Sequence, residues 1–254
     1  MNTFKAEIGL KIAQFKRYPT DFLSELFMLV LIFVGIFGSG EIVGNGVNSA
    51  SFKSLLMSYM LWILIQQTIG NMGGEISYEA QTGTIEQLYT MPTSSEKIFF
   101  AKNVVSALSS IVEMIITLII IMLINSVWIN FPLMLLFPLI LAFLTIIGVG
   151  YLIASIVLLT KQFSNLLQII EYVYLPILLI KFDYSPLSNT LLEIIVPVHE
   201  IANWMTLIIN HQNYNFNLYM VISTVDCFLW LILGLTAFKK ANNLAKHSGK
   251  IGNF

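Results

Sequence analysis

Long apolar runs are the feature that most constrains how this chain can fold. A helix that crosses a membrane needs about 20 apolar residues, because each residue adds about 1.5 Å and the hydrocarbon core is about 30 Å thick. Six runs reach or approach this length, at residues 22–38, 52–74, 104–124, 139–160, 163–180 and 216–238. We therefore expect an all-α integral membrane protein with six transmembrane helices in a single domain.

The composition excludes several other classes of protein. Hydrophobic residues make up 57% of the 254 residues and charged residues only 11%, whereas an average soluble domain has about 25% charged residues. A soluble fold of this size cannot bury so much apolar surface, so soluble enzymes, nucleic-acid-binding proteins and disordered chains are set aside. The net charge of -1 gives no overall field that would attract polyanions.

The fourth apolar run starts well before its predicted span. It extends from Phe131 to Thr160 and carries Pro132 and Pro138 near its start. Thirty residues are too many for one upright span. We expect an interfacial turn, broken at a proline, before a span at 139–160.

The basic residues predict the orientation, because lysine and arginine are retained on the cytoplasmic side of a membrane. Eleven of them fall on one side of the predicted spans, namely Lys5, Lys11, Lys16, Arg17, Lys97, Lys102, Lys161, Lys239, Lys240, Lys246 and Lys250. Only Lys53 and Lys181 fall on the other. Both termini are therefore expected in the cytoplasm. Residues 182–215 are expected outside, as a re-entrant or interfacial helical hairpin.

Residues 1–18 are too polar for a span but have the pattern of an interfacial helix on the inner leaflet. Its apolar stripe is formed by Phe4, Ile8, Ile12 and Phe15, and its polar face by Lys5, Lys11, Lys16 and Arg17. Pro19 should end it, and Thr20 or Asp21 should cap the first span. The alternatives are a loose basic tail or a signal peptide, although no A-x-A cleavage site follows.

The cytoplasmic segment 75–103 contains a second pattern of local signals. Gly83 should break the helical extension of the second span, and Thr84 should cap a short helix. The apolar face of that helix would be Ile85, Leu88 and Tyr89, and Pro92 would stop it. Such a surface is suited to docking another protein; the alternative is a well-capped connector without a partner.

The start of the third helix has its own signals. Thr93 and Glu96 have the spacing of a capping box. Lys97 and Lys102 should hold this entrance in the headgroup region.

The stretch from Glu79 to Pro92, EAQTGTIEQLYTMP, resembles the acidic-x-x-x-Gly-Thr-hydrophobic-Glu-Gln-Leu…Pro segment of ABC-2 type transporter permeases. These are the membrane subunits of bacterial ATP-binding cassette exporters, and the expected topology is also similar. The motif maps onto Glu79, Gly83, Thr84, Glu86, Gln87 and Pro92. Ala80 departs from it, because many relatives have a charged residue there. The resemblance implies a connecting helix at 1–18, a coupling helix at 82–89 and a second ATPase contact at 160–165.

The function implied by this resemblance is that of a permease in the bacterial plasma membrane. It would export a small amphipathic substrate, such as a drug, toxin or antimicrobial peptide, by ATP-driven alternating access. Two copies of a separate ABC ATPase would bind a homodimer, or a heterodimer with a similar permease. Alternatives are an exporter of lipids or lipid-linked glycans, or an ion-coupled secondary transporter.

Motifs for catalysis or cofactor binding are missing from the sequence. There is no G-x-x-x-x-G-K-[ST], so ATP and Mg²⁺ would be bound by the partner ATPase and no cofactor directly by this chain. His199 and Glu200 do not continue into H-E-x-x-H, and no metal site is expected. An intramembrane enzyme would need acids and histidines at fixed spacing, and none are found. Gly70 and Gly74 form a G-x-x-x-G, which marks either a close helix contact or, in a chain with 15 glycines, a coincidence.

Three acids fall near the middle of predicted spans: Glu113, Glu171 and Asp226. Each costs about 2.5 to 3.5 kcal/mol at a helix centre, and no lysine or arginine lies at that depth. They should therefore face protein or a water-filled cavity. Either they are protonated and bond to neighbouring helices through groups such as Ser109, Ser110 or Thr224, or they line a translocation route that favours cationic cargo.

Overall fold

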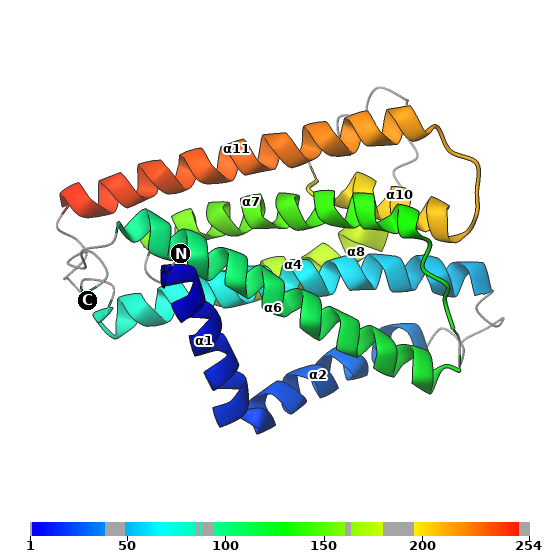
Figure 1. Cartoon of the computed structure of the whole chain (residues 1–254), viewed down its shortest axis with the longest axis horizontal. Helices are drawn as coiled ribbons and strands as arrows, with labels where there is room; N and C mark the ends of the chain where they lie inside the picture. Colours follow the sequence, from blue (N-terminus) through cyan, green and yellow to red (C-terminus); the bar gives the residue numbers. More distant parts are fainter. Residues whose placement is uncertain are drawn as a thin grey trace.

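The computed structural model describes residues 2–38, 49–84, 87, 94–126, 128–160, 164–179 and 196–248, and within them the chain is almost entirely helical, with no strand (Figure 1). The elements are α1 (Asn2–Arg17), α2 (Pro19–Phe33), the π-helix η1 (Val34–Gly38), α4 (Ser49–Gln81), α6 (Ser95–Ile124), the 3-10 turn η2 (Leu133–Leu135), α7 (Leu136–Thr160), α8 (Ser164–Leu179), α10 (His199–Ile209) and α11 (Phe216–Ser248).

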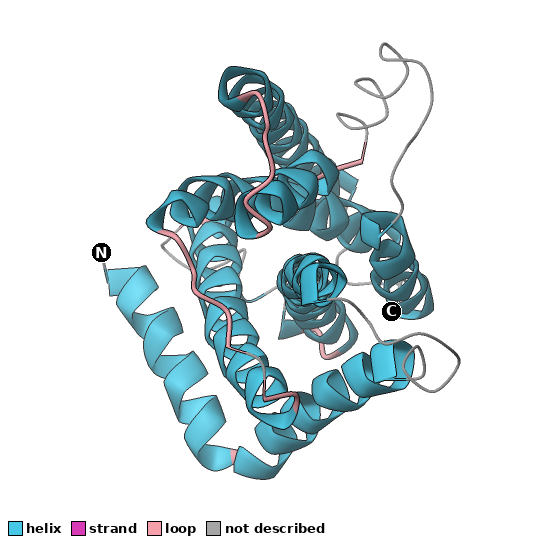
Figure 2. Cartoon of the chain, turned by 90° about the vertical axis from the view of Figure 1, so that its right-hand side faces the viewer, coloured by secondary structure: helices cyan, strands magenta, loops and turns pink. Residues whose placement is uncertain are grey.

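The long helices α4, α6, α7 and α11 run alongside one another, whereas α1 crosses the bundle (Figures 1 and 2). We name the two ends of the bundle by residues that lie there. At the Gly83 end α4 and α7 finish and α6 begins, and at the Asn125 end α6 finishes and α7 begins. The α11 helix runs from the Asn125 end to the Gly83 end (Figure 1).

Helix α4 is at the centre of the bundle. It contacts α6, α7, α8 and α10, and its side chains from Leu56 to Ile65 are all buried. Tyr59 and Trp62 are among the largest of these, and each is anchored by a hydrogen bond to another helix. The Tyr59 hydroxyl donates to the Leu29 carbonyl, and the Trp62 indole N–H donates to the Glu171 carbonyl at 2.7 Å. These bonds satisfy polar groups that the apolar core would otherwise leave unpaired.

Four helical stretches of the described chain are long and apolar enough to cross a membrane: Pro19–Phe37, Ser95–Ile124, Leu133–Thr160 and Phe216–Ala245. They correspond to the predicted first, third, fourth and sixth spans. The predicted second and fifth spans do not qualify. Helix α4 carries Gln66, Gln67 and Asn71 in its middle, and the described part of α8 has 16 residues. The membrane-protein class is confirmed, whereas the count of six spans and the external hairpin are not.

The predicted caps were wrong at two helix starts. Helix α2 begins at Pro19, and the residue before it makes no side-chain capping bond, so neither Thr20 nor Asp21 caps this helix. Proline suits the first position of a helix because its fixed φ is helical and its missing N–H is not needed there. Helix α6 has Ser94 as its N-cap, one residue after the predicted Thr93, and Ser94 also makes no side-chain capping bond.

Helix ends differ from the ends of the apolar runs. Helix α6 starts nine residues before the predicted span at 104, and α11 continues ten residues past the predicted end at 238. The turn predicted before the fourth span is η2, and α7 then starts at Leu136 instead of 139. Pro138 lies in the first turn of α7, where a proline interrupts no hydrogen bond of the helix. An apolar run therefore marks the apolar part of a helix and not its full length.

Glycines permit the closest helix contacts. A Cβ added at Gly234 of α11 would lie 2.0 Å from the carbonyl oxygen of Gly148 in α7, so the two backbones touch. In α4 the pair that approaches α8 is Gly70 and Gly73: a Cβ at Gly73 would meet the Leu167 side chain at 2.6 Å. Gly74 faces open space. The predicted contact through Gly70 and Gly74 is thus wrong by one position.

Candidate functional site

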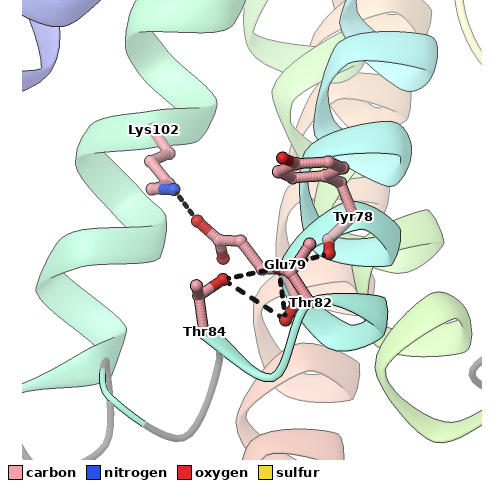
Figure 3. Close-up of polar contacts among 5 residues, drawn as sticks. All are labelled: Tyr78, Glu79, Thr82, Thr84 and Lys102. Atoms are coloured by element: carbon pink, nitrogen blue, oxygen red, sulfur yellow. Dashed lines mark hydrogen bonds and ion pairs between the residues drawn. The ribbon is translucent and has the colours of Figure 1, made fainter.

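The end of α4 is a turn held by its own hydroxyl groups (Figure 3). Gly83 has a φ of +71°, a left-handed conformation that glycine adopts without strain, and it stops the helix after Gln81. The Thr82 hydroxyl donates to the Tyr78 carbonyl at 2.8 Å, and the Thr84 hydroxyl donates to the Glu79 carbonyl at 3.4 Å. The predicted break at Gly83 is confirmed. The Thr84 hydroxyl, however, bonds back to α4.

Glu79 of α4 and Lys102 of α6 form an ion pair beside this turn (Figure 3). Both side chains are largely buried, with 14% and 15% of their surface exposed. The second carboxylate oxygen of Glu79 is buried and has no hydrogen-bond partner among the described residues. Lys102 therefore joins two helices and does not serve only as a headgroup contact. Helices α4 and α6 run antiparallel (Figure 1), and this arrangement places Glu79 and Lys102 opposite each other.

A polar cavity of about 160 Å³ lies next to the ion pair, between α1, α4 and α6. Its charged lining residues are Glu7, Lys11, Glu75 and Lys102. We call these four residues and Glu79 the charge cluster. The Lys11 ammonium also donates to the Asn71 side-chain carbonyl at 3.5 Å.

Burial is the main influence on the two acids that line this cavity. It raises the pKa of Glu75 and of Glu7 above the ordinary value of 4.5, although the nearby charge of Lys102 opposes the rise. The charge cluster therefore brings partly buried charged groups of α1, α4 and α6 together near the turn at Gly83.

Helix α1 packs on α6, and part of the apolar stripe that the sequence predicts is covered by protein. Phe4, Ile8 and Phe15 are half-buried, and the Phe15 ring meets the Phe22 ring edge-on at 5.0 Å. Ile12 is 49% exposed, so it is not half-buried as the other three stripe residues are. The amphipathic helix is present and crosses the bundle (Figures 1 and 2). Its placement on the inner leaflet stays a prediction.

The predicted docking face lies almost wholly outside the described residues. Of the proposed coupling helix at 82–89, the structure describes residues 82–84 and residue 87. The side chains of Thr82, Thr84 and Gln87 are exposed. Ile85, Glu86, Leu88, Tyr89 and Pro92 lie outside the described residues, as do residues 161–163 of the second predicted contact. The docking surface therefore stays a prediction, and the described turn and charge cluster lie directly before it in the chain or beside that turn.

The three midspan acids are buried at separate places. Glu113 is 1% exposed, Glu171 8% and Asp226 0%. The Glu171 carboxylate lies against Gly70 of α4, and one Asp226 oxygen accepts a hydrogen bond from the Val198 N–H at 3.2 Å. None of the three lines a cavity identified among the described residues.

The hydroxyl groups predicted as partners of these acids donate to backbone carbonyls instead. Ser109 and Ser110 donate to the Ser106 carbonyl, and Thr224 donates to the Met220 carbonyl. These are local bonds within one helix, which a hydroxyl makes readily when it faces an apolar neighbour. The contact between Asp226 and the Val198 backbone was not predicted, and its sequence signal is weak because the two residues are 28 positions apart.

The described residues contain no group of three or more His, Cys, Asp and Glu side chains that could hold a metal ion.

No curated protein and no solved structure matches the chain significantly. The family model described as "ABC-2 family transporter protein" matches residues 10–179, about two thirds of the chain. The matched region starts within α1, contains the turn at Gly83 and the charge cluster apart from Glu7, and ends with α8. The chain therefore belongs to the ABC-2 transporter family and is a membrane subunit whose partner is an ABC ATPase.

Proposed function

We propose that this chain is the permease subunit of a bacterial ABC exporter that moves a small amphipathic substrate out of the cell. The observation that carries the proposal is the family match over residues 10–179, which includes the whole segment from Glu79 to Pro92. Two permease subunits, identical or similar, would pair with two ATPase subunits. Those ATPase subunits would bind ATP and Mg²⁺.

The charge cluster suggests how ATPase movement would reach the membrane helices. Closure of the ATPase subunits would push on the segment that follows Gly83. The ion pair between Glu79 and Lys102 would pass this push from α4 to α6, and Glu75 and Lys11 would pass it to α1. The helices would then rock between inward-open and outward-open states, a two-state change biased by ATP.

The arrangement of basic residues supports a cytoplasmic Gly83 end. Lys97 and Lys102 lie in the first part of α6, and Lys239 and Lys240 lie in the last part of α11, which reaches the same end (Figure 1). Lys53 lies near the start of α4, at the opposite end. Both termini would then be cytoplasmic and α10 would be near the outer face.

The midspan acids belong to this proposal as candidate route residues for cationic cargo. Glu113→Gln, Glu171→Gln and Asp226→Asn should reduce export of cationic cargo while sparing neutral cargo. Equal loss of both cargoes, or loss of the protein from the membrane, would assign the three acids to packing alone.

The proposal is tested with the chain and its ATPase together. An ATPase with a P-loop, encoded beside this chain, should co-purify with it, and its ATP hydrolysis should change when the pair is placed in vesicles. Growth of a deletion strain across antimicrobial classes would identify the cargo. An ATPase partner that drives uptake into cells, or a chain that transports without ATP, would contradict the proposal.

A further inference from the structure

An apolar cavity of about 320 Å³ lies in the half of the bundle nearer the Asn125 end. Four elements form its wall: α4, α6, α10 and the segment that includes η2 and the start of α7. All the residues that line it are leucine, isoleucine, methionine, phenylalanine or proline, so among the described residues no side chain there can donate or accept a strong hydrogen bond. This cavity is separate from the charge cluster and from the three midspan acids.

The cavity leads from the surface of the bundle into its core. At the outer side, Leu133 is 83% exposed and Leu136 is 53% exposed. At the inner side, Met60 is 6% exposed and Met205 is 2% exposed. The exposed residues stand at the start of Leu133–Thr160, a stretch long and apolar enough to cross a membrane, so they would meet the bilayer where its hydrocarbon begins. A molecule that enters this cavity therefore comes from the bilayer.

The chemistry of the wall selects the class of ligand. Water is unstable in a cavity without polar partners, and an empty apolar cavity forfeits dispersion contacts along its whole wall. Methionines line part of it, and their flexible thioether side chains adapt to a ligand of variable shape. No cation or anion would find a counter-charge there.

We propose that this cavity binds one alkyl chain, inserted from the bilayer between η2 and α6. The chain belongs to a membrane phospholipid or to a single-chain amphiphile. Binding of this chain does not depend on the ATPase or on the direction of transport. The inference therefore stands or falls separately from the proposed function.

Photolabelling of the full-length protein tests this site. The protein is placed in vesicles of phosphatidylethanolamine and phosphatidylglycerol that contain a phosphatidylcholine with a diazirine at the end of one acyl chain. A parallel sample contains a diazirine fatty acid instead. Illumination followed by peptide mass spectrometry locates the labelled residues. We expect label on Met205, which lipid around the outside of the protein does not reach.

The pattern of labelling decides the outcome. Label on Met205 from the phospholipid alone assigns the chain to a membrane lipid, and label from the fatty acid alone assigns it to a single-chain amphiphile. Label from both supports an alkyl site of either origin. Label confined to exposed residues such as Leu133, with none on Met205, would overturn the proposal. This result comes from the wild-type protein, so it does not depend on the folding of a variant.

A matched pair of variants adds a second test. Leu118 is 8% exposed and lines the cavity, whereas its neighbour Ile119 is 46% exposed and is not part of the lining. Leu118→Trp should fill the cavity and reduce Met205 labelling at least fivefold, whereas Ile119→Trp should leave it unchanged. Equal labelling of folded Leu118→Trp and wild-type protein would contradict a site within this cavity.

Discussion

Glu79 and Lys102 form an ion pair that joins the last turn of α4 to the first half of α6. The pair lies beside the turn at Gly83, from which the predicted docking segment continues. A force applied to that segment therefore meets α4 and α6 together. In an exporter of this family, such a link would couple ATPase closure to the membrane helices.

Charge reversal tests this link. Glu79→Lys and Lys102→Glu should each place two like charges side by side in a largely buried position, and each should destabilise the protein by about 1–3 kcal/mol. The double variant restores opposite charges at positions 79 and 102 but places a carboxylate near Glu7 and Glu75, so it should recover only part of the melting temperature and of the ATP-driven transport. A double variant as impaired as the two single variants would show that the pair is incidental.

The contact between Gly148 and Gly234 predicts a steric effect. Gly234→Ala places a methyl group on the Gly148 carbonyl and should separate α7 from α11, at a cost of about 1–3 kcal/mol. Gly74→Ala is the matched control, because a Cβ at Gly74 meets nothing within 4 Å. It should be neutral or slightly stabilising. The melting temperatures of the purified variants measure both effects, and equal values for the two variants would disprove the close contact.

The docking of α1 should depend on pH. Burial raises the pKa of Glu7 and of Glu75 above 4.5, so the folded protein holds these protons more tightly than the unfolded chain does. The stability that they contribute is complete below pH 4.5 and is lost as the pH rises through their folded-state pKa values. Spin labels at Ala13 of α1 and Phe100 of α6 should report a distance distribution that broadens as the pH rises.

Glu75→Gln provides the control for this pH effect. The variant removes one of the two titrating groups and should flatten the broadening. The same pH dependence in wild-type protein and in this variant would exclude Glu75 as a cause.

Asp226 should anchor the start of α10. Asp226→Leu removes the acceptor of the Val198 N–H and should cost about 1–3 kcal/mol, because a buried donor is left unpaired. Asp226→Asn keeps an oxygen acceptor and should cost less. Hydrogen–deuterium exchange across His199–Ile209 should accelerate in the leucine variant and change little in the asparagine variant. Identical exchange in both variants would exclude this anchoring role.

Local signals predicted much of the fold. The apolar run at 163–180 predicts a helix, and α8 is described within it, at Ser164–Leu179, because an apolar run of this length favours a helix over a strand. Gly83 stopped α4 as expected because the left-handed conformation is a property of the residue itself. Local patterns work where the cause of the structure is local.

Contacts between helices were harder to predict. A glycine repeat does not show which face of α4 meets α8. The repeat pairs Gly70 with Gly74, whereas Gly73 lies against α8 in the structure. Lys102 was assigned to lipid headgroups because its partner Glu79 lies on another helix. The number of spans was hard to predict for a related reason. Helix α4 is polar in its middle and lies at the centre of the bundle, so hydropathy alone does not decide whether it crosses the membrane.

The central claim is that the segment after Gly83 docks an ABC ATPase, and co-purification of that ATPase with variants of the segment tests it most directly. Ile85→Asp and Leu88→Asp put a charge on the predicted apolar docking face, and Leu88→Met is the conservative control. We predict that both aspartate variants insert into the membrane in normal amounts but lose the ATPase on purification in detergent, whereas Leu88→Met retains it. Normal co-purification of the ATPase with both aspartate variants would contradict the account.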